Sequence, residues 1–149
     1  MPRLRERIGV NTHLANWETL DLARQAGCGS VRVDGVWPMV QPERHRWDWT
    51  RLDATIHSAC ERDLQVYLTL GGSPGWTNNA NPPNVPPTQL QDWEVFIEAV
   101  GRRYRGKVHV YSIWNEPNID GYWTGTVEQY VDQLVLPASR ILHGIDPSN

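Results

Sequence analysis

The strongest chemical signal in the sequence is Glu116, which follows Trp114 and Asn115 and precedes Pro117 at the end of a segment with strand character. A carboxyl held at a strand end among apolar rings can have a raised pKa and stay protonated near neutral pH, as a general acid must. The neighbouring amide can hydrogen-bond a hydroxyl group of a ligand. We therefore predict that Glu116 is a general acid and that Asn115 binds the substrate. A solvated carboxylate in a turn is the alternative interpretation.

Charged residues with a regular alternation form the second candidate group. Arg32 and Asp34 alternate with Val31 and Val33, so the two charged side chains share one face of a strand. We predict that Arg32 lies in the site, where its cation would keep a second carboxylate ionised. A purely structural Arg32–Asp34 ion pair is the alternative. His13 is predicted to hydrogen-bond the ligand or the acid, with a structural histidine as the alternative.

Tryptophan is unusually common, with eight in 149 residues beside a single Phe. An indole in a loop that follows a strand can cover the apolar face of a sugar ring, whereas an indole on a helix face packs into a core. We expect at least one of three loop tryptophans to line a sugar subsite: Trp37, Trp76 and Trp123. Three others fall on helix faces and are predicted to be core residues: Trp17, Trp49 and Trp93.

The elements that must position these residues alternate in a strand-first order, which is typical of βα units with a parallel sheet. In such folds ligands bind at the carboxyl ends of the strands, where the polar candidates lie. Asn16 is predicted to cap the first helix, and Pro137 to kink or break the last one. The predicted strands cover residues 8–13, 30–35, 65–70 and 108–114, and the helices cover residues 16–27, 49–62, 88–104 and 126–143.

The length of these units predicts a fold class. Four βα units in 149 residues average about 37 residues, near the ~31 per unit of a TIM (β/α)8 barrel. We predict an α/β chain whose single domain, residues 1–149, is the N-terminal half of such a barrel. Another strand is expected where the chain stops, and we therefore expect the remaining units of the barrel to lie outside these 149 residues. A complete doubly wound domain is the rival, although no GxGxxG or GxxxxGK loop supports it.

A half barrel has an open side that a complete barrel lacks. Helices would cover only one face of its sheet, while a parallel sheet is normally covered on both. We expect the open face to expose Val10, Val108, Val110 and Leu68 or its neighbours. Its outer strands would offer unpaired edges, so self-association through the open barrel face is expected.

Composition and charge narrow the function classes further. A formal net charge of −3 gives no cationic surface for nucleic acid. No apolar run approaches the ~20 residues of a membrane span, and the Arg-rich start of the chain has no apolar stretch of the length expected for a signal peptide. The chain as written is thus expected to be soluble and cytoplasmic, or secreted if an upstream signal was lost. Cys28 and Cys60 are predicted to be buried thiols, and neither a metal nor a cofactor is implied.

Several segments together resemble a known group of enzymes. Besides Asn115 and Glu116 these segments are Val-Arg-Val-Asp at 31–34, Trp37, Gln-Pro-Glu at 41–43, Trp-Asp-Trp-Thr-Arg-Leu-Asp at 47–53 and Gly-Gly-Ser-Pro-Gly-Trp at 71–76. They resemble the retaining glycoside hydrolases of the barrel clan whose acid/base Glu follows an Asn at the end of strand four. The loop at 71–76 is most similar to that of glycoside hydrolase family 39, and lacks the His that family 5 cellulases often place nearby.

This resemblance implies a carbohydrate substrate and a double-displacement mechanism on β-linked oligo- or polysaccharides, with Glu116 as acid and then base. The clan's nucleophile is a second Glu at the end of strand seven, which this chain does not contain. The 149-residue chain is therefore expected to be inactive alone. Two alternatives remain: a non-catalytic carbohydrate-binding half barrel, and a half-barrel unit that self-associates.

Overall fold

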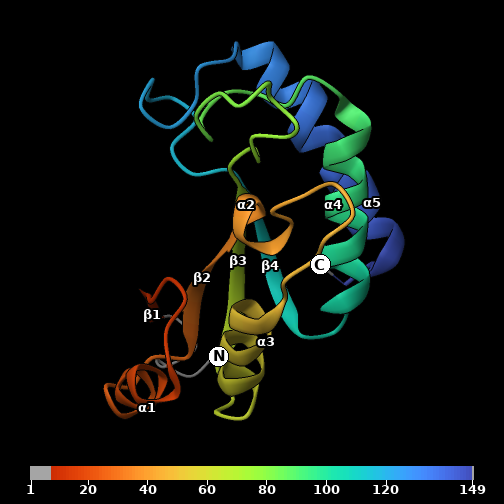
Figure 1. The fold of residues 1–149 in the computed structure, drawn as a ribbon. Coiled ribbons are helices and arrows are strands. Elements are labelled where there is room, and N and C mark those ends of the chain that lie inside the picture. Colours follow the sequence, from red (N-terminus) through yellow and green to blue (C-terminus); the bar gives the residue numbers. More distant parts are fainter. Residues whose placement is uncertain (1–7, 149) are drawn as a thin grey trace.

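The computed structural model describes residues 8–148, which form a parallel sheet with the strand order β1-β2-β3-β4 (Figure 1). Each strand runs into a helix before the next strand begins. A doubly wound domain would reverse the strand order at a switch point, and this order has no reversal, so the rival prediction is wrong. The elements are β1 (Gly9–Asn11), α1 (Trp17–Gln25), β2 (Ser30–Val36), α2 (Trp37–Val40), α3 (Thr50–Cys60), β3 (Gln65–Gly71), α4 (Leu90–Arg103), β4 (Val108–Ile113), the π-helix η2 (Gln129–Val135) and α5 (Leu136–Ile145).

The alternation of side chains along β2 separates the two faces of the sheet. Val31 and Val33 are fully buried on the face that the helices cover, and they extend into a core shared with α3, α4 and α5. Arg32 and Asp34 point to the other face, where the register pairs Arg32 with Tyr67 of β3. The largest fully buried side chains of the core include Trp37, Trp93, Tyr104, Phe96, Leu20 and Ile56.

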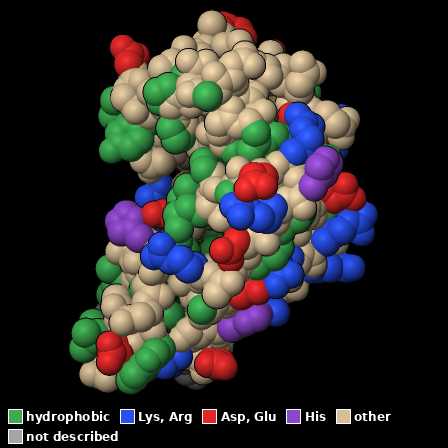
Figure 2. Space-filling model, in the orientation of Figure 1, with side chains coloured by type: hydrophobic (Ala, Val, Ile, Leu, Met, Phe, Trp, Pro, Cys, Tyr) green, Lys and Arg blue, Asp and Glu red, His purple; other side chains and the backbone are tan. Residues whose placement is uncertain are grey.

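The uncovered face of the sheet exposes apolar side chains. The space-filling view shows the molecule from the side of α2 and α3, where Lys, Arg, Asp and Glu side chains are interspersed with apolar ones (Figure 2). Tyr67 of β3 is 38% exposed, and its register partner Val110 of β4 is 44% exposed. The prediction of an open apolar face is confirmed for Val110. For Leu68 or its neighbours the prediction is met by Tyr67, because Leu68 itself is buried, and it is wrong for Val108, which is buried too. Val10 is exposed as predicted, but it lies on the edge strand β1. Its register partner is Val31, whose side chain is on the helix-covered face, so Val10 belongs to that face and not to the open one.

Local signals set several helix ends as predicted. Asn16 caps α1, because its Oδ1 accepts a hydrogen bond from the Thr19 backbone N–H at 3.0 Å. The last helix is interrupted next to Pro137, since η2 ends at Val135 and α5 begins at Leu136. Proline has no N–H to donate to the preceding turn, so it is tolerated in the first turn of a new helix.

Other local expectations differ from the structure. The strand β1 covers Gly9–Asn11 alone, and His13 leaves the extended conformation with a φ of 52°. Trp17, predicted to be a core residue, is 58% exposed at the start of α1, because the buried stripe of this helix runs through Leu20 and Ala23. Trp93 is fully buried as predicted. Trp49 is half-buried and stacks on Trp47 with ring centroids 5.1 Å apart.

The basic start of the chain, residues 1–7, and Asn149 lie outside the described residues. The expectation about a signal peptide falls on that start. No helix between residues 8 and 148 has the length and apolar character that crossing a membrane would require.

Candidate active site

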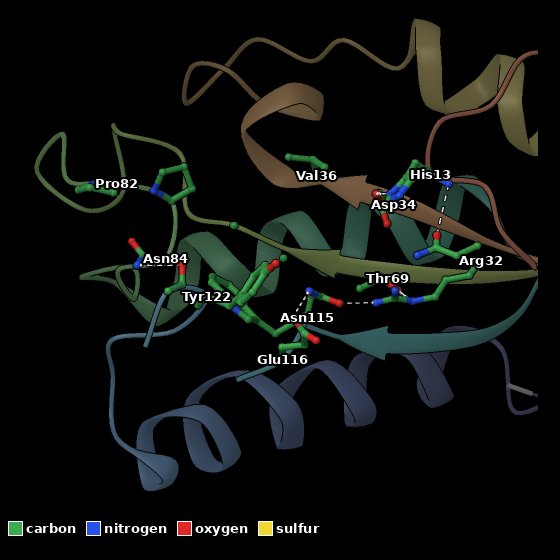
Figure 3. Close-up of a pocket in the computed structure, with 16 residues that line it drawn as sticks. His13, Arg32, Asp34, Val36, Thr69, Pro82, Asn84, Asn115, Glu116 and Tyr122 are labelled. Carbon is green, nitrogen blue, oxygen red and sulfur yellow. Dashed lines mark hydrogen bonds and ion pairs between the residues drawn. The ribbon is translucent and has the colours of Figure 1, made fainter. Parts of the chain in front are cut away.

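A cavity of about 810 Å³ lies at the carboxyl ends of the four strands (Figure 3). The ends of β1 and β2, the loop after β3 and the loop after β4 all contribute to its lining. Four residues predicted from the sequence meet in it, although they come from three different strands and their loops: His13, Arg32, Asn115 and Glu116. The structure therefore brings together the predicted acid and the three predicted polar binding residues.

The backbone around Glu116 adopts a rare conformation. Trp114 has a φ of 64° and Glu116 a φ of 47°, in the left-handed region that bulky side chains seldom enter. Two bonds from Trp114 hold this turn: its N–H donates to the Leu70 carbonyl at 2.6 Å, and its indole N–H donates to the Tyr122 carbonyl at 2.7 Å. His13 is also left-handed. Such strain gathers at functional sites, where the surrounding structure enforces it.

Arg32 determines how the Asn115 amide is turned. Its Nη2 donates to Asn115 Oδ1 at 2.7 Å, and its Nε donates to Thr69 Oγ1 at 2.8 Å. With its oxygen occupied, Asn115 directs its Nδ2 toward the Glu116 carboxylate, 3.5 Å away. Arg32 is a half-buried cation at the floor of the cavity, placed to favour negative charge near it.

Asp34 binds His13 instead of Arg32. The His13 Nδ1 and Asp34 Oδ2 atoms are 2.5 Å apart, which joins the loop after β1 to the end of β2. The alternative of an Arg32–Asp34 ion pair is therefore wrong within the described residues. The His13 ring remains largely exposed at the cavity, so its second nitrogen is free to meet a ligand.

A tyrosine supports the strand from behind the site. The Tyr130 hydroxyl donates to the Ile113 carbonyl at 2.7 Å, one residue before the strained Trp114. Burial raises the pKa of Tyr130, so its hydroxyl stays neutral and keeps this bond through the physiological pH range. The helical segment η2 thereby fixes the end of β4.

The predicted sugar-stacking tryptophans do not line the cavity. Trp37 is fully buried in α2, where it donates to Gln41, and Trp123 is 4% exposed beneath the loop after β4. A side chain without exposed surface cannot stack on a ligand, so the prediction is wrong for these two. Trp76 is half-buried, bonds the Gln41 carbonyl and packs under Arg44, away from the cavity lining.

The cavity also contains an exposed aromatic residue that no sequence pattern indicated, Tyr122. It directly precedes the buried Trp123 in a polar loop. The Pro- and Asn-rich loop between β3 and α4, which its position after a strand predicts to be a cleft wall rather than a linker, does line the cavity through Pro82, Pro83 and Asn84.

Within residues 8–148 no three His, Cys, Asp or Glu side chains come together as a metal site would require. Cys28 is a buried free thiol, and Cys60 is a half-buried one.

Sequence comparison finds relatives among carbohydrate-cleaving enzymes, while no protein-family model matches the chain. The "Endo-1,4-beta-xylanase 1" of Gibberella zeae is 29% identical in an alignment of 140 residues that covers 88% of this chain and 39% of that protein. The "Endo-1,4-beta-xylanase C" of Paenibacillus barcinonensis is 29% identical in an alignment of 90 residues that covers 55% of this chain and 8% of that protein.

Solved structures share the fold. A GH39 enzyme from Xanthomonas axonopodis pv. citri matches 97% of this chain and 34% of its own length, with a TM-score of 0.74 and 18% identity. Xylanase 10B from Thermotoga petrophila matches 94% of this chain and 46% of its own length, with a TM-score of 0.69 and 19% identity.

The chain is thus a relative of the glycoside hydrolases that are built on (β/α)8 barrels. Its α/β fold, with four parallel strands that alternate with helices, matches part of those barrels and confirms the predicted fold class. The chain spans less than half the length of the curated relatives that it matches.

Proposed function

We propose that the chain is the acid/base half of a retaining glycoside hydrolase that cleaves β-linked oligo- or polysaccharides. The observation that carries the proposal is the position of Glu116, at the end of β4 in the cavity, beside an Asn115 that Arg32 orients. Glu116 would protonate the leaving oxygen and then deprotonate water. The domain, residues 1–149, would be the N-terminal half of the catalytic barrel.

Asn115, Arg32 and His13 have distinct roles in this proposal. The Nδ2 of Asn115 would donate to a sugar hydroxyl, a bond that strengthens as the oxocarbenium-like transition state forms. Arg32 would hold Asn115 and favour the ionised form of the attacking carboxylate. His13, fixed by Asp34, would bond another hydroxyl of the same sugar.

The attacking carboxylate must come from outside the described residues. The carboxylates that line the cavity are Asp34 and Glu116. Asp34 lies on β2, two strand positions from β4, which is about 9–10 Å at the backbone. A retaining pair needs a separation of about 5 Å, and Asp34 is occupied by His13. Four further βα units would supply the second carboxylate and would shield Glu116, which is exposed in the described residues, from solvent.

The related xylanases direct the choice of substrate. Both curated relatives are named as endo-1,4-β-xylanases, so β-1,4-linked xylose oligomers are the substrates that we propose to test first. A non-catalytic carbohydrate-binding half barrel is the second candidate, because polar side chains that can hydrogen-bond hydroxyl groups line the described cavity, which lacks a retaining pair of carboxylates.

The test compares the full natural protein with its Glu116→Ala variant on phenyl and 2,4-dinitrophenyl β-xylobioside. The phenyl leaving group needs protonation, so Glu116→Ala should lower kcat/KM for the phenyl substrate about 10³-fold. The dinitrophenyl leaving group departs without protonation, so the variant should still form the covalent intermediate from that substrate. Azide should then restore turnover of the dinitrophenyl substrate by the variant, because an anionic nucleophile attacks the intermediate without a general base.

Glu128→Ala is the control, since this exposed Glu lies outside the cavity lining and should leave the activity unchanged. Full activity of Glu116→Ala on the phenyl substrate would contradict the role of Glu116. A wild-type protein that binds xylotetraose without cleaving either substrate would favour the second candidate.

A further inference from the structure

The cavity has two unlike sides, and Glu116 lies between them. One side consists of polar groups at the strand ends, among them Arg32 and Thr69, while the other is a wall formed by the loops after β3 and β4. Asn115 and Glu116 lie between Tyr122 of this wall and the Arg32 side (Figure 3).

Asn84 ties the two loops of the wall together. Its Nδ2 lies 3.3 Å from the carbonyl oxygens of both Asp120 and Gly121, and its own carbonyl accepts from the Thr124 N–H at 3.0 Å. The preceding Pro83 carbonyl accepts from the Ser73 N–H at 2.8 Å. The wall is therefore braced against the end of β3 rather than being a free loop.

Tyr122 is the aromatic surface of this wall. Tyr122 is 47% exposed, yet both its backbone N–H and its backbone carbonyl are hydrogen-bonded. The Tyr122 N–H donates to the Ile119 carbonyl at 2.8 Å, and its carbonyl accepts from the Trp114 indole at 2.7 Å. Trp114 directly precedes Asn115, so one side chain links the aromatic residue to the turn that carries Glu116.

A ring with an exposed apolar face and a fixed backbone suits the flat C–H face of a β-linked sugar. A general acid contacts the oxygen that joins two sugar units, so those units lie on opposite sides of Glu116. The attacking carboxylate belongs to the strand-end side, where Arg32 lies and the strands of a barrel converge. The departing sugar must then lie toward the wall.

We infer that Tyr122 is the stacking platform for the sugar that leaves, and so determines which leaving groups the site accepts. The inference rests on the proposed function. It assigns to Tyr122 the role that the sequence suggested for Trp37, Trp76 or Trp123.

The experiment compares two substrates, xylotetraose and β-xylobiosyl fluoride, in the full natural protein. Fluoride has no ring to stack, so the platform can affect only xylotetraose. Tyr122→Ala should lower kcat/KM for xylotetraose about tenfold or more. The kcat/KM for the fluoride should stay within about twofold of the wild-type value. Tyr122→Phe keeps the ring and should stay within about threefold of wild type on both substrates.

Tyr122→Leu is the second variant, since it keeps an apolar side chain in the wall without a flat ring, and it should show the same selective loss as Tyr122→Ala. Trp17→Ala removes an exposed aromatic residue on α1, outside the cavity lining, and should change neither substrate. Equal losses on both substrates, or no loss on xylotetraose, would overturn the inference while the proposed function stands. A wild-type protein that turns over neither substrate would overturn the proposed function and this inference with it.

Discussion

Arg32 and Asn115 are 83 positions apart in the sequence, and the Arg32 Nη2 donates to the Asn115 Oδ1 at 2.7 Å. The bond passes over β3, where Arg32 also holds Thr69, and it connects β2 with the loop that follows β4. Because a carboxamide has distinct donor and acceptor ends, this bond leaves the Asn115 NH₂ group for the cavity.

Removing the Arg32 guanidinium should therefore impair Asn115. In the full natural protein, Arg32→Met should lower kcat/KM for phenyl β-xylobioside by about 10–100-fold, the usual effect of losing a group that orients a binding residue. Asn115→Ala should cause a similar loss. If the two act together, the double variant should be little worse than either single one. Additive losses would show that Arg32 acts independently of Asn115.

Asp53 should make stability depend on pH. The Arg103 guanidinium and the Tyr104 hydroxyl bond its carboxylate, and the bond from Arg103 is the main reason that the pKa of Asp53 lies below its ordinary 3.8. A lowered folded-state pKa stabilises the fold above pH 3.8 and loses this effect as pH falls through the folded value.

Asp53→Asn should thus lower the free energy of unfolding by about 1 kcal/mol at pH 7, a modest figure because Arg103 is partly exposed. Urea unfolding at pH 7 and below pH 3.8 measures the difference. The difference in the free energy of unfolding between wild type and variant should be smaller at the lower pH. A difference that does not depend on pH would contradict the role of the ionised Asp53 carboxylate.

Gly71 should be intolerant of a side chain. A Cβ at this position would lie 3.2 Å from the Trp114 Cα and 3.2 Å from its Cε3. Overpacking of this kind costs about 1–3 kcal/mol, and here it would push on the turn that carries Glu116. Gly71→Ala should lower both the melting temperature and the activity. Gly144→Ala, with open space around its Cβ in α5, is the matched control and should not destabilise.

The isolated chain should self-associate through its open face. Tyr67 and Val110 expose apolar surface on the uncovered side of the sheet, and β1 and β4 each pair on one side only within the described residues. Size-exclusion chromatography with light scattering should find species larger than a monomer. The double variant Tyr67→Lys and Val110→Lys should shift them toward the monomer. A stable wild-type monomer would contradict the prediction.

Local patterns in the sequence by themselves determine which face of a strand a side chain takes and where several helices begin or end. The Val-Arg-Val-Asp alternation at 31–34 assigns each side chain of β2 to a face, because successive residues of a strand point in opposite directions. Asn16 caps its helix and Pro137 marks a helix boundary for equally local reasons. The strand-first order places Asn115 and Glu116 at a strand end, where the structure has them.

The tertiary structure alone decides which groups meet and which surfaces stay exposed. Nothing near Arg32 in the sequence specifies Asn115 as its partner, since the pairing depends on three strands lying side by side. Trp37 and Trp123 have the sequence context of loop residues, but distant helices and loops cover them, while Tyr122 beside Trp123 stays in the cavity. Burial depends on segments far away in the chain, and these come together only when the fold packs its core.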